Sequence, residues 1–180
     1  MKLSREETLL AIIDVQEKIF ATMHEQVETE KNILRLITGA KALDLPIVWT
    51  EQYPKGLGPT LKSIREAMAD HEALEKIAFS CFGDRAIRET IESLEKNQVL
   101  VCGIEAHVCV YQTAADLMEN GYNVHVVSDA VMSRKASNWQ VALQRMRDLG
   151  ANVTSVEMAL FELQAVAKGE SFKAIAEIIK

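Results

Sequence analysis

The chain contains 180 residues, of which 48% are hydrophobic and 26% are charged, and its formal net charge is −6. This composition predicts one globular domain over residues 1–180, and the acidic balance argues against a nucleic-acid or anionic-membrane surface. The chain has no apolar stretch of membrane-spanning length and no regular framework among its three cysteines, so we expect a cytoplasmic protein with reduced thiols.

The first elements alternate between strand and helix. Residues 8–14 form an apolar run that ends in Asp14, which is typical of a central parallel strand buried on both faces. Apolar residues at helical spacing over 33–43 predict a helix, and Pro46 separates it from a second strand at 47–50.

The next segment is richer in turn formers. Residues 51–60 hold two prolines and two glycines, and they are predicted to form an ordered loop at the sheet edge where Asp14 emerges. A helical turn or two is expected over 60–69, and a short strand over 73–79 carries Lys76.

Residues 98–134 are predicted to form one strand–helix–strand unit. It comprises a strand at 98–102, a tight turn at Gly103, a helix over 107–120 and a strand at 122–128. Asp84 is a plausible N-cap for the preceding helix. The remaining chain predicts a helix through 141–149, a last strand at 152–156 and terminal helices over 158–167 and 171–179.

Strands that alternate with helices predict an α/β fold. We expect an open, mostly parallel six-stranded sheet in the order 3-2-1-4-5-6, with helices on both faces in a Rossmann-like three-layer sandwich. Strands 1 and 4 are then neighbours where the winding reverses. Because Asp14 and Cys109 follow the carboxyl ends of these strands, we expect them to share one site.

Cys109 falls in the first turn of the predicted helix, where free backbone N–H groups and the helix dipole favour a negative charge. This placement predicts a thiolate. The dipole supplies only about 0.3–1 kcal/mol, whereas lowering a thiol pKa from about 8.5 to about 7 takes roughly 2 kcal/mol. A nearby cation is therefore expected, and a reaction would also need a base.

Residues 103–110 (GIEAHVCV), followed by Gln112-Thr113-Ala114 and Asp116, resemble the isochorismatase-like hydrolases, the cysteine hydrolases that include nicotinamidases and carbamoylsarcosine amidases. Asp14-Val15-Gln16 and residues 121–130 agree with the same pattern, so the resemblance covers nearly the whole chain. Residues 49–60 are similar more narrowly to the isochorismatase domain-containing subgroup.

The resemblance implies a catalytic triad of Asp14 as general base, Lys76 as cation and Cys109 as nucleophile. Cys109 would attack an amide or related carbon and form a thioester, which water then hydrolyses. The resemblance also implies a cis peptide without proline at Ile104–Glu105, which turns the amide of Glu105 inward to join that of Cys109 as an oxyanion hole.

The substrate pocket is expected to be lined by Gln16, Trp49, Tyr53, Phe79 and Ile104. Trp49 and Tyr53 would either stack on a substrate ring or only wall the pocket, and both alternatives stay open. Cys102 is expected to be a buried core residue, as is Cys81, unless Cys81 lines the pocket beside Phe79.

Two departures from the family pattern narrow the prediction. Nicotinamidases carry an Asp-x-His metal cluster after the second strand, whereas the matching place here holds Glu51-Gln52-Tyr53, so neither a metal nor another cofactor is expected. Isochorismatases that cleave a vinyl ether lack the nucleophilic cysteine, so Cys109 favours covalent hydrolysis.

The sequence therefore predicts a metal-independent cysteine hydrolase that acts on a small amide-type metabolite. Two alternatives stay open, a nicotinamidase-class amidase and a catalytically silent binding or scaffold protein of the same fold. The expected partners are the small-molecule substrate and further copies of the chain, as a dimer or larger homo-oligomer, but neither nucleic acid nor membrane.

Overall fold

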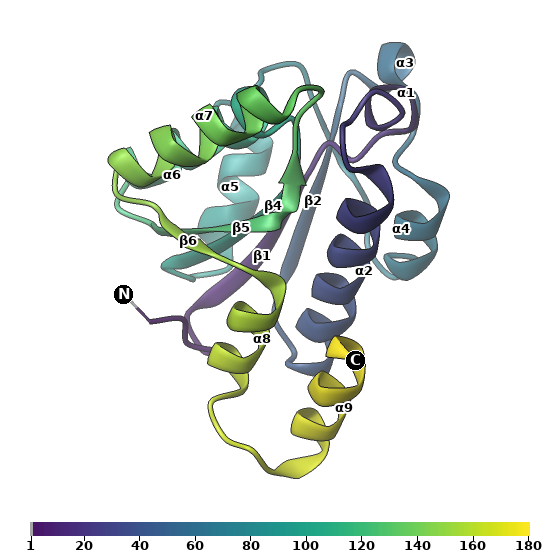
Figure 1. Cartoon of the computed structure of the whole chain (residues 1–180). Coiled ribbons are helices and arrows are strands. Elements are labelled where there is room, and N and C mark those ends of the chain that lie inside the picture. Colours follow the sequence, from purple (N-terminus) through teal and green to yellow (C-terminus); the bar gives the residue numbers. More distant parts are fainter. Residues whose placement is uncertain (1) are drawn as a thin grey trace.

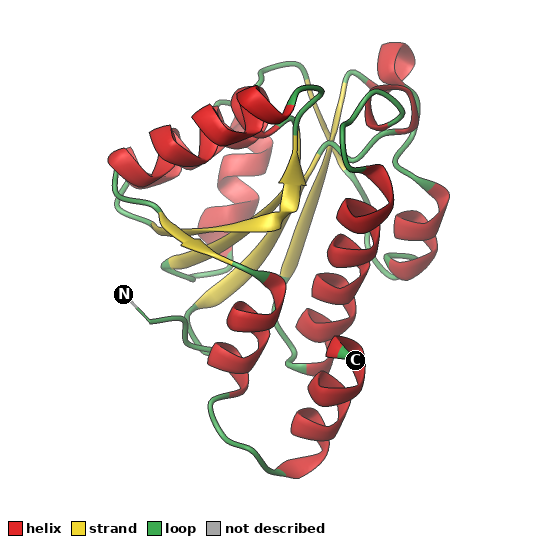
Figure 2. Cartoon of the chain, viewed as in Figure 1, coloured by secondary structure: helices red, strands yellow, loops and turns green. Residues whose placement is uncertain are grey.

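A computed structural model describes residues 2–180, and its centre is a six-stranded sheet in which every strand pair is parallel (Figures 1 and 2). The sheet order is β3-β2-β1-β4-β5-β6, which confirms the predicted order 3-2-1-4-5-6. The strands are β1 (Thr8–Ile13), β2 (Ile47–Gln52), β3 (Leu74–Lys76), β4 (Gln98–Ile104), β5 (Asn123–Met132) and β6 (Asn152–Thr154).

Helices cover both faces of the sheet, which confirms the expected three layers (Figure 1). One face carries α2 (Gln26–Ala42), α4 (Lys62–Ala67), α8 (Val156–Gln164) and α9 (Gly169–Ile179). The other carries α5 (Arg85–Ser93), α6 (Tyr111–Glu119) and α7 (Ala136–Asp148). Two short helices, α1 (Glu17–Phe20) and α3 (Pro54–Leu57), lie beyond the carboxyl ends of the strands. Among the described residues, no helix combines the length and the apolarity needed to cross a membrane.

Each face of the sheet has its own apolar core, and β1 contributes to both. Leu10 and Ile12 pack on the α2 face, while Leu9, Ala11 and Ile13 pack on the opposite face. All residues of β1 are buried. A central strand covered on both sides needs apolar side chains at every position, which explains the continuous apolar run.

Several element boundaries differ from the prediction. The loop expected over 51–60 begins later than predicted, because β2 continues to Gln52. The segment also contains the short helix α3, which begins at Pro54, and proline is favourable in the first turn of a helix. The strand expected over 73–79 ends at Lys76. The strand expected over 122–128 runs on to Met132, past a register shift against β4. The capping role of Asp84 is confirmed, since its carboxylate accepts from the N–H groups of Ala86 and Ile87.

The tight turn predicted at Gly103 is also wrong. Gly103 lies within β4 with φ +118°, a backbone conformation that favours glycine. A Cβ atom there would lie 2.1 Å from the carbonyl oxygen of Ile13. Gly103 therefore allows β1 and β4 to approach each other just before the positions of Asp14 and Cys109.

We expect Gly103→Ala to destabilise the fold by at least about 2 kcal/mol, because it adds a backbone clash to an unfavourable φ. Urea denaturation followed by circular dichroism measures the loss. Gly121→Ala is the matched control, since Gly121 also has positive φ (+87°) but has no atom within 4 Å of its would-be Cβ. Equal losses in the two variants would show that the close approach to Ile13 is unimportant.

Candidate active site

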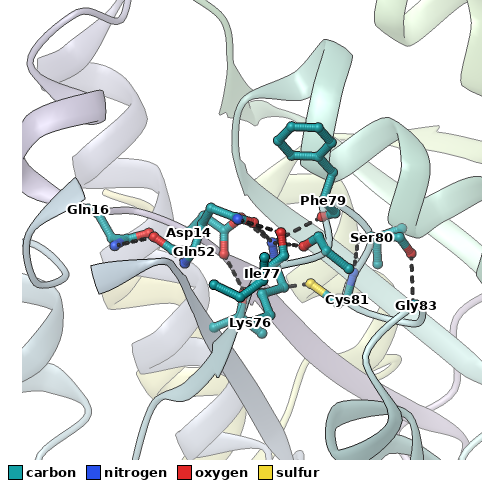
Figure 3. A network of polar contacts seen from close by, with 12 residues as sticks. Asp14, Gln16, Gln52, Lys76, Ile77, Phe79, Ser80, Cys81 and Gly83 are labelled. Carbon is teal, nitrogen blue, oxygen red and sulfur yellow. Dashed lines mark hydrogen bonds and ion pairs between the residues drawn. The ribbon is translucent and has the colours of Figure 1, made fainter. Parts of the chain in front are cut away.

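Three strands bring the candidate residues together at the carboxyl edge of the sheet. Asp14 follows β1, and Cys109 lies just after β4, the direct neighbour of β1. Lys76 ends β3, where it pairs in register with Gln52 of β2. The polar contacts of Asp14 and Lys76 belong to one network, which also includes Gln52 and Cys81 (Figure 3).

The amine of Lys76 and the carboxylate of Asp14 form a buried ion pair. Lys76 Nζ lies 2.6 Å from Asp14 Oδ2, and both side chains are buried. Thr50 Oγ1 donates to the other carboxylate oxygen, Oδ1, at 2.7 Å. The amine also donates to Gln52 Oε1 at 2.8 Å, and to the carbonyl oxygens of Phe79 at 3.0 Å and Ala78 at 3.2 Å. Both charges are thus paired and hydrogen-bonded, as burial requires.

The charge on Lys76 is stabilised by its neighbours. Burial by itself would lower the pKa of the amine, but the negative charge of Asp14 and its hydrogen bond with the amine raise the pKa above its ordinary value. At neutral pH this amine is therefore positively charged.

Cys109 is 6% exposed and lies in a π-helical turn, η1 (Ala106–Val110), rather than in the regular α-helix predicted over 107–120. In this turn the N–H of Val110 donates to the carbonyl of Glu105, five residues earlier, at 3.3 Å. The chain then continues as α6. Single π-helical turns are frequent at functional sites.

The prediction that Cys109 rests as a thiolate is wrong. Burial raises the pKa of this thiol, and so does the carboxylate of Asp14, both by its charge and by accepting a hydrogen bond from the thiol; Lys76 acts in the opposite sense but does not prevail. The helix dipole contributes at most about 1 kcal/mol and is outweighed. The resting pair is therefore a neutral thiol beside a carboxylate that can take its proton.

We expect alkylation of Cys109 by iodoacetamide to be slow at neutral pH and to keep accelerating above about pH 9, since only the thiolate reacts. Rate constants at a series of pH values, read for each cysteine by peptide mass spectrometry, measure this profile. Glutathione, a free thiol, is the control. If the rate constant for Cys109 reached half of its maximum at a pH equal to or below the corresponding pH for glutathione, the raised pKa would be contradicted.

The peptide bond between Ile104 and Glu105 is cis, as the resemblance implies. Glu105 is buried, and its carboxylate accepts from Arg134 Nε at 2.8 Å. Its carbonyl accepts from the N–H of Val108 at 3.0 Å. These contacts fix the backbone between the end of β4 and Cys109.

The residues expected to line the pocket do not lie together. Trp49 and Ile104 belong to the core on the α2 face, whereas Cys109 and Cys81 belong to the core on the other face. Alternation along β2 explains the position of Trp49, because Thr50, the next residue, reaches Asp14.

The other three expected pocket residues lie nearer the ion pair. The side chain of Gln16 is buried and hydrogen-bonded to backbone, to the N–H and C=O of Gln52 and to the C=O of Gly58. Tyr53 and Phe79 are 51% and 54% exposed. The N–H of Tyr53 donates to the carbonyl of Lys76 at 2.9 Å, so Tyr53 and Phe79 both border Lys76.

Thr50 and Gln52 are site residues that the sequence did not single out for a role there, whereas Cys81 was considered only as an alternative pocket residue. Cys81 is buried, its sulfur lies 3.6 Å from Thr50 Oγ1, and burial raises the pKa of its thiol to about 11. The expectation of a buried Cys81 is confirmed. The alternation of side chains along β2 could have indicated Thr50 and Gln52, because residues two apart lie on the same face of a strand.

The place that matches the nicotinamidase metal cluster is engaged in other contacts. Glu51 Oε1 accepts from the N–H and the hydroxyl of Thr60, both at 2.7 Å, and Gln52 contacts Lys76. Within residues 2–180, no group of three or more His, Cys, Asp or Glu side chains is arranged to hold a metal ion.

The isochorismatase domain model matches residues 8–158 of the chain. The chain belongs to the isochorismatase family. This isochorismatase-family chain is 39% identical over 178 residues to the secreted isochorismatase effector Isc1 of Phytophthora sojae, covering 96% of the chain and 84% of the relative. It is 36% identical over 180 residues to isochorismatase domain-containing protein 2 of Danio rerio, and the match covers 99% of the chain and 89% of the relative.

A solved structure agrees with this family assignment. The MAR1 ribonuclease of Caenorhabditis elegans superposes with a TM-score of 0.93 at 35% identity, over 99% of the isochorismatase-family chain and 92% of the other. The resemblance to the isochorismatase domain-containing subgroup is therefore confirmed, and the family relationship indicates a hydrolase.

Proposed function

We propose that the chain is a cysteine hydrolase that cleaves the C–N bond of a small amide-type metabolite through a thioester on Cys109. The observation that supports this most is the buried Lys76–Asp14 ion pair, whose two charges both act on the pKa of the Cys109 thiol. A buried cation, base and thiol gathered at one edge of the sheet form an expensive arrangement unless they perform chemistry.

In the proposed reaction, Asp14 takes the thiol proton as the sulfur of Cys109 attacks the carbonyl carbon. The backbone N–H groups of Glu105 and Cys109 stabilise the negative oxygen that forms. The C–N bond then breaks, and Asp14 passes the proton to the departing nitrogen. In the second half, Asp14 takes a proton from water, which attacks the thioester, and the sulfur leaves and regains that proton.

Lys76 acts throughout as a fixed positive charge in this proposal. Its amine lies 2.6 Å from the carboxylate of Asp14 and compensates the negative charge in a buried place. The carbonyl of Phe79 contacts the amine, the backbone of Tyr53 contacts the backbone of Lys76, and both side chains are exposed, so they are our candidates for direct substrate contact.

The alternative functions lead to different measurements. A nicotinamidase-class amidase would hydrolyse nicotinamide, and a silent scaffold would hydrolyse no amide. One relative is named a ribonuclease, but a net charge of −6 disfavours RNA binding here. The expected homo-oligomer and cytoplasmic location stay predictions, and one relative is named as a secreted protein.

The direct test is to trap the intermediate. The protein is mixed with small primary and secondary amides, nicotinamide included, quenched in acid and examined by peptide mass spectrometry. We expect an acyl group on Cys109 that hydroxylamine removes, together with release of the amine. Amine release without an acylated Cys109 would overturn the thioester route, and neither signal with any amide would favour the scaffold.

A further inference from the structure

The side chain of Gln52 contacts both the amine of Lys76 and the backbone that follows it. Gln52 Oε1 accepts from Lys76 Nζ at 2.8 Å, while Gln52 Nε2 donates to the carbonyl oxygen of Ile77 at 2.7 Å. An ammonium only donates and a carbonyl only accepts, so both contacts fix the orientation of the amide. Figure 3 shows these residues around the ion pair.

The amine of Lys76 has more acceptors than protons. Three N–H groups are shared among Asp14 Oδ2, Gln52 Oε1 and the carbonyl oxygens of Phe79 and Ala78. Without Gln52, the remaining neutral acceptors both come from the turn just after Lys76, and the amine would be free to move toward that turn. Gln52 approaches from a different strand, β2, and opposes this movement.

Gln52 is itself held in place by the buried side chain of Gln16. Gln16 Oε1 accepts from the backbone N–H of Gln52 at 2.7 Å, and Gln16 Nε2 donates to the carbonyl of Gln52 at 3.0 Å. This pair of bonds imitates a neighbouring strand at the end of β2. Both amide groups are neutral, so the support leaves the charge on Lys76 undiminished.

We propose that Gln52, held by Gln16, is a positioning residue that keeps the ammonium of Lys76 against Asp14 and thereby sets how readily Cys109 loses its proton. This inference rests on the proposed function, because it concerns the same three side chains. It also assigns Gln16 to the support of the site instead of to the substrate pocket.

Alkylation of Cys109 tests this without a known substrate. We expect Gln52→Leu to lower the rate constant for iodoacetamide about three- to tenfold at about pH 8, equivalent to a rise of half to one unit in the thiol pKa. Gln16→Leu should act in the same direction. Gln144→Leu, at an exposed glutamine on α7, is the matched control and should leave the rate unchanged.

A double-mutant cycle separates positioning from a structural role. In a Lys76→Met background, Gln52→Leu should have no further effect on the rate, because the group it positions is absent. An equal loss in both backgrounds, or faster labelling from a loosened fold, would overturn the inference. If Lys76→Met does not fold, the Gln52→Leu variant alone decides: slower labelling of Cys109 supports the inference, and an unchanged or faster rate contradicts it. Circular dichroism and slow labelling of the buried Cys102 show that the variant is folded.

The Cys109 labelling rate in Lys76→Met tests the proposed function separately from the role of Gln52. Lys76→Met with an unchanged Cys109 rate would remove Lys76 from the proposed chemistry. A slower rate in Lys76→Met but not in Gln52→Leu would overturn only the role of Gln52.

Discussion

Cys109→Ala is expected to abolish amide hydrolysis, with a fall in rate of at least about 10³-fold and complete loss of the acylated peptide, because no other group would form the thioester. The change removes one buried sulfur and leaves the Asp14–Lys76 pair intact, so the variant should fold. Ammonia or amine release from the best amide of the panel measures the effect.

Cys102→Ala provides the matched control. Cys102 is another buried free cysteine, but it packs on the opposite face of the sheet from Cys109. Its replacement should preserve hydrolysis and cost only the packing of a small side chain. Hydrolysis in Cys109→Ala above about a tenth of the wild-type rate would rule out this residue as the nucleophile.

Lys76→Met is expected to cost about 3–5 kcal/mol of unfolding free energy, because it leaves the carboxylate of Asp14 buried without its cation. The double variant Lys76→Met/Asp14→Asn should recover part of this loss, since neither remaining group is charged. Urea denaturation of the wild type, Lys76→Met, Asp14→Asn and the double variant at neutral pH gives the four values that define the coupling energy between the two sites.

An exposed lysine gives the comparison for this stability effect. Lys173 lies 2.7 Å from Glu170 on α9, and its side chain is 71% exposed. Lys173→Met should change stability by no more than about 1 kcal/mol, because solvent screens the pair. Similar losses for Lys76→Met and Lys173→Met would mean that the buried pair contributes little to the fold.

The sheet and the meeting of the candidate residues could be predicted from sequence because both depend on patterns along the chain. The apolar run before Asp14 indicates a central strand, and alternating elements indicate the sheet order. That order alone places Asp14 beside Cys109. Lys76 required the family resemblance, because a lysine at the end of a short edge strand has no local pattern of its own.

The features that escaped prediction depend on contacts between distant residues. The protonation state of Cys109 follows from how deeply packing buries it and from Asp14, 95 positions earlier. Thr50 contacts Asp14 at the end of the next strand, so Trp49 points to the opposite face of the sheet and enters the core on the α2 face. Gln52 contacts Lys76 because β2 and β3 pair in register, which the sequence does not specify.

The π-helical turn that carries Cys109 makes the spacing of this segment as important as its composition. Because its hydrogen bond closes over five residues instead of four, the turn contains one residue more than a regular helix would need. A single deletion between Ala106 and Val110 would close this turn as a regular helical turn and change the position of Cys109 relative to the end of β4. Insertions and deletions in this segment would therefore separate the sulfur from its base.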